Sequence, residues 1–232
     1  MGIRQWLRGL LCPAPSAPPW ITAPAPGGPC QHITFINHST QVTPAQFQAC
    51  VAVLQVQVDR DFAPVWGVYA TVDALPGGWP ISILDASDVP GALGYHDVDP
   101  TGTPFGRVFV ETSQLQSVSW QSVASHELLE LLADPFVFGA APGPGGTFWA
   151  LEVGDPVEDV RYTINGIEVS DFATPAWFSG IPSAGPFDAQ HAVQAAHQIT
   201  FGGYASVFQN GAWAQIPGGR LNVDAAYQRH RP

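Results

Sequence analysis

The chain of 232 residues is long enough for one folded domain with a sizeable hydrophobic core. Hydrophobic residues make up 46% of it and charged residues only 12%, which argues against wholesale disorder. Its formal net charge of −11 disfavours nucleic acid or an anionic membrane surface as a partner. No apolar run reaches the roughly 18 residues of a membrane-spanning helix, so we expect no membrane span.

The N-terminal 30 residues are rich in proline and alanine and predict a poorly ordered segment. Their apolar stretch is short and interrupted by Arg8, so we expect no export signal, and a secreted or particle-associated location stays open. Three cysteines lack the C-x-x-C spacing of metal sites and allow one disulfide and one free thiol: Cys12, Cys30 and Cys50.

From residue 31 onward the pattern predicts a mixed sheet with helices on one side. Residues 32–38 form a β-rich run, and a helix should begin at Thr43 and Pro44 and continue to about Phe62, with Pro64 ending it. Four further strands are expected, and a turn at 76–78 separates the first two. They are residues 65–75, 79–85, 91–97 and 106–112.

The central helix is expected at residues 117–135, where Pro135 disfavours helical geometry at Asp134. It is apolar on most sides, which is typical of a buried helix. His126 and Glu130 stand at i and i+4, so their side chains share one face, and Glu127 lies between them in sequence.

Burying this imidazole and the two carboxylates costs free energy unless something compensates them, and a divalent metal ion would do so. The alternative is an ordinary amphipathic helix on which Glu127 and Glu130 are solvated. An acidic run about 20 residues later can supply a third ligand, although such a run is also typical of a solvated loop. It consists of Glu152, Asp155, Glu158 and Asp159.

The rest of the chain predicts a loop, two hairpins and a tail. Residues 136–146 are rich in glycine and proline and predict the loop. Asn165-Gly166 and Asn210-Gly211 each predict a two-residue hairpin turn. Between them, residues 170–180 are expected to pack Phe172, Trp177 and Phe178 on the core. We therefore divide the chain into a metal-binding domain at 31–180 and a hairpin extension with a tail at 181–232, packed on the same domain.

The segments Ser125-His126-Glu127, Glu130 and Asp134-Pro135 resemble the zincin-like metallopeptidases. They are most similar to uncharacterised bacterial and phage proteins with the pattern S-H-E-x-x-E-x-x-x-D-P. The resemblance covers roughly residues 31–215 and implies an α+β, zincin-like fold: a twisted mixed sheet, a supporting helix and an H-E-x-x-E helix beneath an edge strand. It extends to residues 94–97, 104–109, 152–155 and 175–178.

The resemblance also implies a zinc-dependent hydrolase, most simply a peptidase with a polypeptide substrate. His126, Glu130 and either Asp155 or Glu152 would hold the metal. The position of Asp134 two turns below His126 makes it a further candidate ligand, unless it is only a polar residue at the helix end. Glu127 would be the general base. His96 would stabilise the oxyanion, unless it is a strand-end histidine with no such role.

One departure from the family pattern is Glu130, which stands where the well-studied zincins have a second histidine. Its charge lowers the Lewis acidity of the ion, and oxygen-rich coordination admits calcium, magnesium or manganese as well as zinc. The alternative function is therefore a non-catalytic zincin-like module with a structural ion or none, which binds a protein partner. A purely structural domain with solvated carboxylates is a third possibility.

Overall fold

The structure is a computed structural model that describes residues 30–179 and 185–219. Most of the proline-rich N-terminal segment and the end of the predicted tail lie outside these residues, as do residues 180–184. The division predicted between residues 180 and 181 therefore stays a prediction. Within the described residues the fold is mixed α+β, with three sheets and a small number of helices.

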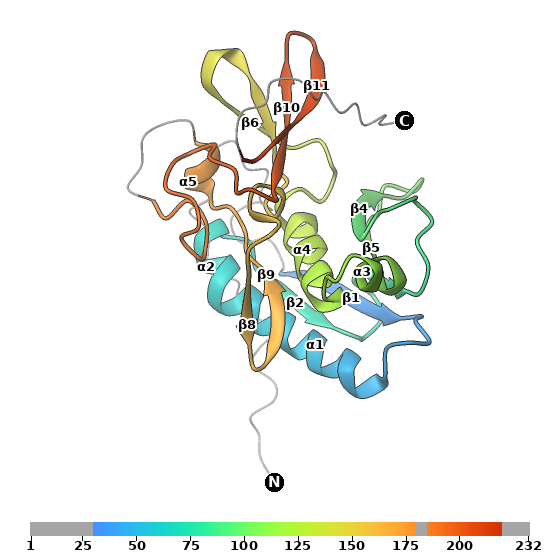
Figure 1. Cartoon of the computed structure of the whole chain (residues 1–232). Coiled ribbons are helices and arrows are strands. Elements are labelled where there is room, and N and C mark those ends of the chain that lie inside the picture. Colours follow the sequence, from blue (N-terminus) through green and yellow to red (C-terminus); the bar gives the residue numbers. More distant parts are fainter. Residues whose placement is uncertain (1–29, 180–184, 220–232) are drawn as a thin grey trace.

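The largest sheet has five strands in the order β2-β1-β3-β5-β4 (Figure 1). Neighbouring strands are parallel, except that β4 runs antiparallel to β5 and forms one edge. The predicted mixed sheet is thus confirmed, with an antiparallel edge strand. The strands are β1 (Gln31–Asn37), β2 (Ala70–Asp73), β3 (Trp79–Leu84), β4 (Gly94–Val98) and β5 (Pro104–Phe109).

One face of this sheet is buried and the other is partly exposed, as the alternation of side chains along a strand requires. Ile81 and Ile83 of β3 are fully buried, whereas Ser82 between them is half-buried. The register aligns Ile81 with Gly106 and Gly106 with His96. His96 on the edge strand therefore projects from the buried face.

The first helical segment is longer than predicted. Helix α1 (Pro44–Gln57) starts at Thr43 with a capping box completed by Gln46 and continues through a π-helical turn, η1 (Val58–Phe62), into α2 (Ala63–Trp66). The expectation that Pro64 ends the helix is wrong. Pro64 lies in the first turn of α2, where its missing N–H is tolerated, and the helix ends instead at the left-handed Gly67 (φ 69°). The strand predicted at 65–75 is accordingly reduced to β2.

The strand predicted at 106–112 is also shorter in the structure, because α3 (Val110–Leu115) begins directly after β5. The Ser113 hydroxyl donates to the Phe109 carbonyl at 2.6 Å inside this turn, and Val110 is buried against the core. Tertiary packing here outweighs the β propensity of the Val-rich run.

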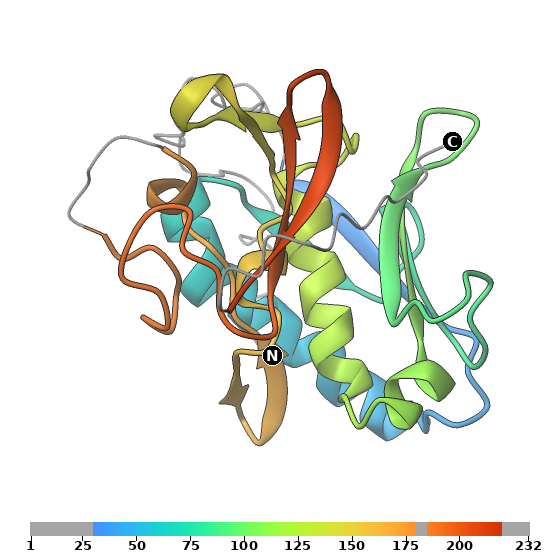
Figure 2. The ribbon, with the colours of Figure 1, turned by 45° about the horizontal axis from the view of Figure 1, so that its top comes forward.

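Helix α4 (Trp120–Ala133) is the predicted central helix. Ser119 is its N-cap and accepts a hydrogen bond from the backbone of Ser122. The helix contacts β4 and β5 on one side and β9 on another, and it lies between the edge of the large sheet and the C-terminal segments (Figures 1 and 2). This position explains why the helix is apolar on most sides.

The second half of the chain builds two smaller sheets, and both predicted hairpins are confirmed. Asn165 and Gly166 have φ values of 50° and 81°, and Asn210 and Gly211 have 53° and 84°, as a two-residue turn with positive φ at both positions requires. Residues 136–146, predicted as a loop, contain a short strand and a 3-10 turn. The strand follows from pairing with β7, since small residues carry little strand signal of their own.

The elements of this half are β6 (Ala140–Pro142), η2 (Pro144–Gly146), β7 (Phe148–Ala150), η3 (Asp155–Val157), β8 (Arg161–Ile164), β9 (Ile167–Ser170), α5 (Pro175–Phe178), β10 (Tyr204–Gln209) and β11 (Ala212–Pro217). Strands β11-β10-β7-β6 form one antiparallel sheet, and β8 and β9 form the other. Phe172, Trp177 and Phe178 are fully buried, as predicted.

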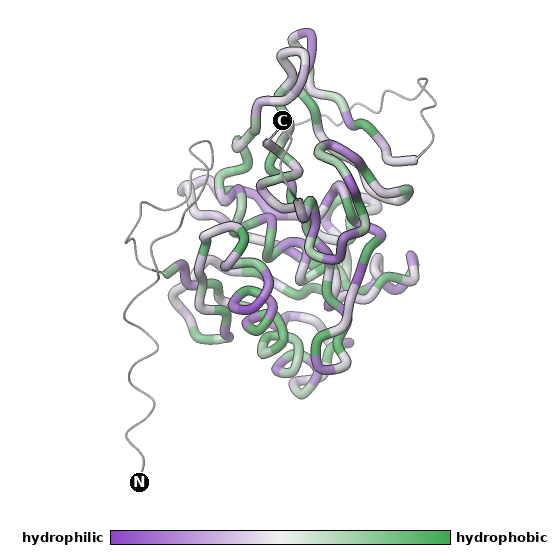
Figure 3. Tube along the Cα trace, turned by 90° about the vertical axis from the view of Figure 1, so that its left-hand side faces the viewer, coloured by the Kyte–Doolittle hydropathy of each residue, from purple (hydrophilic) through white to green (hydrophobic). Residues whose placement is uncertain are grey.

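No helix in the described part of the chain is long and apolar enough to cross a membrane. The hydropathy of the Cα trace changes repeatedly along the fold, with polar and apolar stretches interleaved (Figure 3).

Candidate metal centre

Helix α4 carries His126, Glu127 and Glu130 into the interior. The side chains of Glu127 and Glu130 are 7% and 6% exposed, and that of His126 is 14% exposed. The interpretation of these residues as a solvated stripe is therefore wrong. Two buried carboxylates on one helix need compensation from the surrounding structure.

His126, Glu130 and Asp155 form the first of two groups that could hold a metal ion. His126 Nε2 lies 3.2 Å from Glu130 Oε1 and 3.5 Å from Asp155 Oδ1. Ligands at about 2.0–2.1 Å from a tetrahedral ion are separated from one another by about 3.3 Å. Two of the three distances between the candidate ligand atoms therefore match a zinc coordination shell, and all three atoms lie within 4.8 Å of one another.

Asp155 reaches this group because η3 begins there, a few residues after β7 ends at Ala150. The 3-10 turn starts at Asp155 with Pro156 inside its first turn, and the preceding Gly154 N–H donates to Glu130 Oε1 at 3.2 Å. The acidic run is thus fixed against α4 at its buried end, whereas Asp159 near its far end is exposed.

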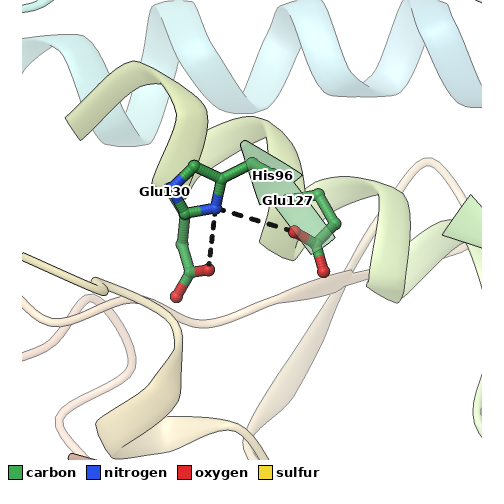
Figure 4. A group of neighbouring side chains, drawn as sticks. All are labelled: His96, Glu127 and Glu130. Carbon is green, nitrogen blue, oxygen red and sulfur yellow. Dashed lines mark ion pairs between the residues drawn. The ribbon is translucent and has the colours of Figure 1, made fainter. Parts of the chain in front are cut away.

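His96, Glu127 and Glu130 form the second group (Figure 4). His96 Nδ1 lies 3.8 Å from Glu127 Oε2 and 3.6 Å from Glu130 Oε2. The other ring nitrogen, Nε2, lies 3.7 Å from Glu152 Oε2. The two groups share Glu130, so that six side chains make one continuous buried cluster: His96, His126, Glu127, Glu130, Glu152 and Asp155.

Two glycines make room for this cluster. A Cβ atom on Gly154 would lie 2.4 Å from His126 Nδ1, and one on Gly94 would lie 2.6 Å from Glu127 Oε1. Both distances are far below van der Waals contact. Only glycine at these positions lets the β4 backbone and the loop before η3 approach α4 so closely.

Burial and mutual repulsion displace the pKa values of the acids in the cluster. Burial, reinforced by the charge of Glu130, raises the pKa of Glu152 to about 8 and also raises that of Asp155. Burial likewise raises the pKa of Glu127. Glu130 differs, because the attraction of both imidazoles outweighs burial and lowers its pKa.

The pKa values of the two imidazoles are raised, whereas that of an ordinary buried histidine is lowered. Burial alone would lower their pKa values, but the surrounding carboxylates overcome it and raise those of His96 and His126 well above the usual range. No arginine forms an ion pair with the cluster among the described residues. In the metal-free protein, protons must therefore supply the positive charge.

The structure separates the candidate third ligands. Asp155 joins His126 and Glu130, whereas Glu152 lies beside His96 and belongs to neither three-residue group. Asp134 is the C-cap residue of α4 and its carboxylate accepts the Gly139 N–H at 2.9 Å, outside both groups.

The sequence predicts His96 at this centre as an oxyanion-stabilising residue, but it predicts neither its place in a second candidate metal group nor the two close-approach glycines. Gly94 and His96 are two residues apart in one strand, so period-2 alternation places them on the same face. That spacing predicts that Gly94 and His96 face the same element. It does not predict that this element is α4.

The fold and the cluster define the protein as a mixed α+β protein with a buried histidine–carboxylate centre. Comparisons with models of known families, with curated proteins and with solved structures give no match to this chain. The chemistry of the centre must therefore be argued from its own geometry.

Proposed function

We propose that this protein is a metal-dependent hydrolase of zincin type that cleaves polypeptides, with zinc as the simplest cation. His126, Glu130 and Asp155 would hold the ion. The observation that carries the proposal is that one imidazole nitrogen lies 3.2 and 3.5 Å from two carboxylate oxygens in a buried site. Calcium, magnesium and manganese remain alternatives, because the donors include two carboxylates.

The ion would supply Lewis acidity and lower the pKa of a water molecule bound to it. Glu127 is suited to accept the proton of that water, since burial raises its pKa above that of an ordinary glutamate and brings it closer to neutrality. Its buried neighbour His96, with Nδ1 3.8 Å from Glu127 Oε2, would stabilise the oxyanion through a ring N–H.

The edge strand β4 offers a place for a peptide. One side of β4 pairs with β5, and the other side has no strand partner among the residues that the structure describes. An extended peptide can pair with such an edge through its backbone. His96 on this strand and Glu127 behind it would then lie near the bound chain, which supports a polypeptide substrate.

A non-catalytic metal-binding module is the second candidate, and one observation favours it. The side chains of Glu127, Glu130 and Asp155 are at most 7% exposed, which leaves little of the centre open to a substrate. A cavity of about 370 Å³ lies instead on the partly exposed face of the large sheet, beside Ser82 and Arg107. In this alternative the ion would be structural and a protein partner would replace the substrate.

Metal content and peptide cleavage together test the proposal. Protein purified without chelators should contain at least one zinc ion per chain, and His126→Ala should lose the ion held by that imidazole. Wild-type protein should cleave members of a broad peptide library. Glu127→Gln should retain the ion at His126 but lose turnover by roughly 10²–10⁴-fold, because it removes the proton acceptor.

Glu158→Gln is the matched control, since Glu158 belongs to the same acidic run but to neither metal-binding group. It should leave both metal content and cleavage unchanged. Equal background cleavage by wild type and Glu127→Gln would refute the peptidase. If the protein still retained its metal, the non-catalytic metal-binding module would be the function that fits.

A further inference from the structure

Glu130 directs its two oxygens toward two different imidazoles. Oε1 lies 3.2 Å from His126 Nε2, and Oε2 lies 3.6 Å from His96 Nδ1. The carboxylate therefore stands between the two groups that could each hold a cation. A carboxylate in this position is able to bind two ions at once, one through each oxygen.

The second group also contains a polar atom that no hydrogen bond satisfies. Glu127 Oε2 is buried and has no hydrogen-bond partner within the described part of the chain, and the Glu127 side chain is 7% exposed. Glu127 Oε2 is the oxygen that faces His96 Nδ1 at 3.8 Å. Buried polar atoms without partners are rare and costly, so an atom of this kind aimed into a ligand group points to a missing partner.

Charge compensation points the same way. Four carboxylates in the cluster carry four negative charges when ionised. One divalent ion with neutral imidazoles leaves two of these uncompensated in a buried site, and two protonated imidazoles without metal leave the same two. Two divalent ions balance the charge of all four carboxylates in their ionised form.

We propose that the cluster holds a second divalent cation, bound by His96 Nδ1, Glu127 Oε2 and Glu130 Oε2, with Glu130 bridging it to the ion at His126 and Asp155. Two-metal sites commonly place their ions about 3.5–4 Å apart. Glu152 would orient the imidazole, since its Oε2 lies 3.7 Å from His96 Nε2 on the side away from the ion.

This inference rests on the proposed function only for the ion at His126. Filling the second position engages both Glu127 and His96, the proton acceptor and the oxyanion-stabilising residue of that function, so a change in turnover cannot show whether the second ion is bound. The number of ions bound per chain separates the two proposals, because His96 belongs only to the second group and Asp155 only to the first.

The test is a titration of metal-free full-length protein with Zn²⁺ and, separately, Mn²⁺, with the bound ions per chain measured by equilibrium dialysis and elemental analysis. Wild type should bind two ions. His96→Gln and Asp155→Asn should each bind one ion tightly. Any second ion should bind at least tenfold more weakly than the second ion of the wild type. Glu158→Gln should bind two. In the Mn²⁺-loaded wild type, electron paramagnetic resonance should show a coupled pair that His96→Gln abolishes.

Glu127→Gln serves as a second variant in case His96→Gln does not fold, because it is close in shape to the native residue. It should lose the second ion and keep the first. Wild type that binds one ion, lost in Asp155→Asn and kept in both His96→Gln and Glu127→Gln, would overturn the second site and leave the proposed function intact. Wild type that binds no ion would overturn both.

Discussion

His126 lies against two carboxylates because residue 154 has no side chain. The Gly154 backbone approaches the imidazole so closely that a Cβ atom there would lie 2.4 Å from Nδ1. The same residue donates its N–H to Glu130. Gly154 thus positions two ligands of the first group at once, through the space that it leaves and through its backbone.

Replacing this glycine tests whether the cluster needs its close approach. Gly154→Ala should push the His126 ring out of place and weaken zinc binding at least tenfold, measured by titration of metal-free protein. Gly202→Ala is the control, because its Cβ would also be too close to a neighbour, 2.7 Å from Asp159 Cβ, but Asp159 belongs to neither group. Equal zinc affinity in wild type and Gly154→Ala would contradict this role.

Among single residues, the sequence predicts the two ligands on the helix better than it predicts the third ligand. The i, i+4 spacing places His126 and Glu130 on one face, and the structure brings Asp155 to them. The choice among Asp134, Glu152 and Asp155 depends on how the chain turns after β7. That turn depends on long-range packing, which a local pattern does not encode.

Among the elements, α4 is fixed to its surroundings by a buried polar network as well as by apolar packing. The Ser125 hydroxyl donates to Gln57 Oε1 at 2.7 Å and accepts the Ser170 N–H at 3.0 Å. Gln57 Nε2 donates to the Ser170 carbonyl at 2.9 Å and to the Tyr162 hydroxyl at 3.0 Å. The network joins the end of α1, the middle of α4 and the β8–β9 hairpin directly beside His126.

Gln57→Leu should therefore destabilise the fold. It leaves the Ser125 hydroxyl and the Ser170 carbonyl buried with a lost partner, at about 1–3 kcal/mol for each. We expect a loss of about 2 kcal/mol or more in the free energy of unfolding, measured by denaturant titration. Gln48→Leu, on the exposed side of the same helix, should change it by no more than about 0.5 kcal/mol. Equal stability of the two variants would contradict the network's role.

The elements themselves could be predicted where local chemistry determines them. Thr43 and Pro44 fix the start of α1, and the two Asn-Gly pairs fix both hairpins. Prediction failed at Pro64, which lies in the first turn of α2 where a proline is tolerated, and at Val110, where packing overrides strand propensity and a helix begins. The sequence also carried no signal for the pairing of β6 with β7.

For the whole molecule, a pair of buried acids outside the metal centre should govern the dependence of stability on pH. Asp171 and Asp188 are both fully buried, and an isolated β-bridge joins Ala173 to Asp188. Burial and the neighbouring Asp188 carboxyl raise the pKa of Asp171 to about 8. The protonated form is thus the one that the fold prefers.

The sign of the pH effect follows from this raised pKa. The stabilisation is complete below the ordinary carboxyl pKa of 3.8 and is lost as the pH rises toward 8, because only the unfolded chain has released the proton in that interval. In metal-saturated protein we expect a fall of about 1.4 kcal/mol per pH unit between pH 5 and 7.5 from this group.

Asp171→Asn isolates this contribution, since an amide mimics the protonated acid and can still accept the Phe172 and Gln190 N–H groups through Oδ1. The variant should lose the slope and become more stable than wild type above pH 8, measured by denaturant titration at each pH. The same slope in wild type and variant would contradict the raised pKa.

The central claim is that His126, Glu130 and Asp155 bind a cation. Anomalous diffraction from zinc-containing crystals of the full chain, recorded above and below the zinc absorption edge, tests it most directly. We predict an anomalous peak within about 2.2 Å of His126 Nε2 and of one oxygen from each acid. Zinc-containing crystals with no anomalous peak in this cluster, and an ion bound only at the surface, would contradict the account.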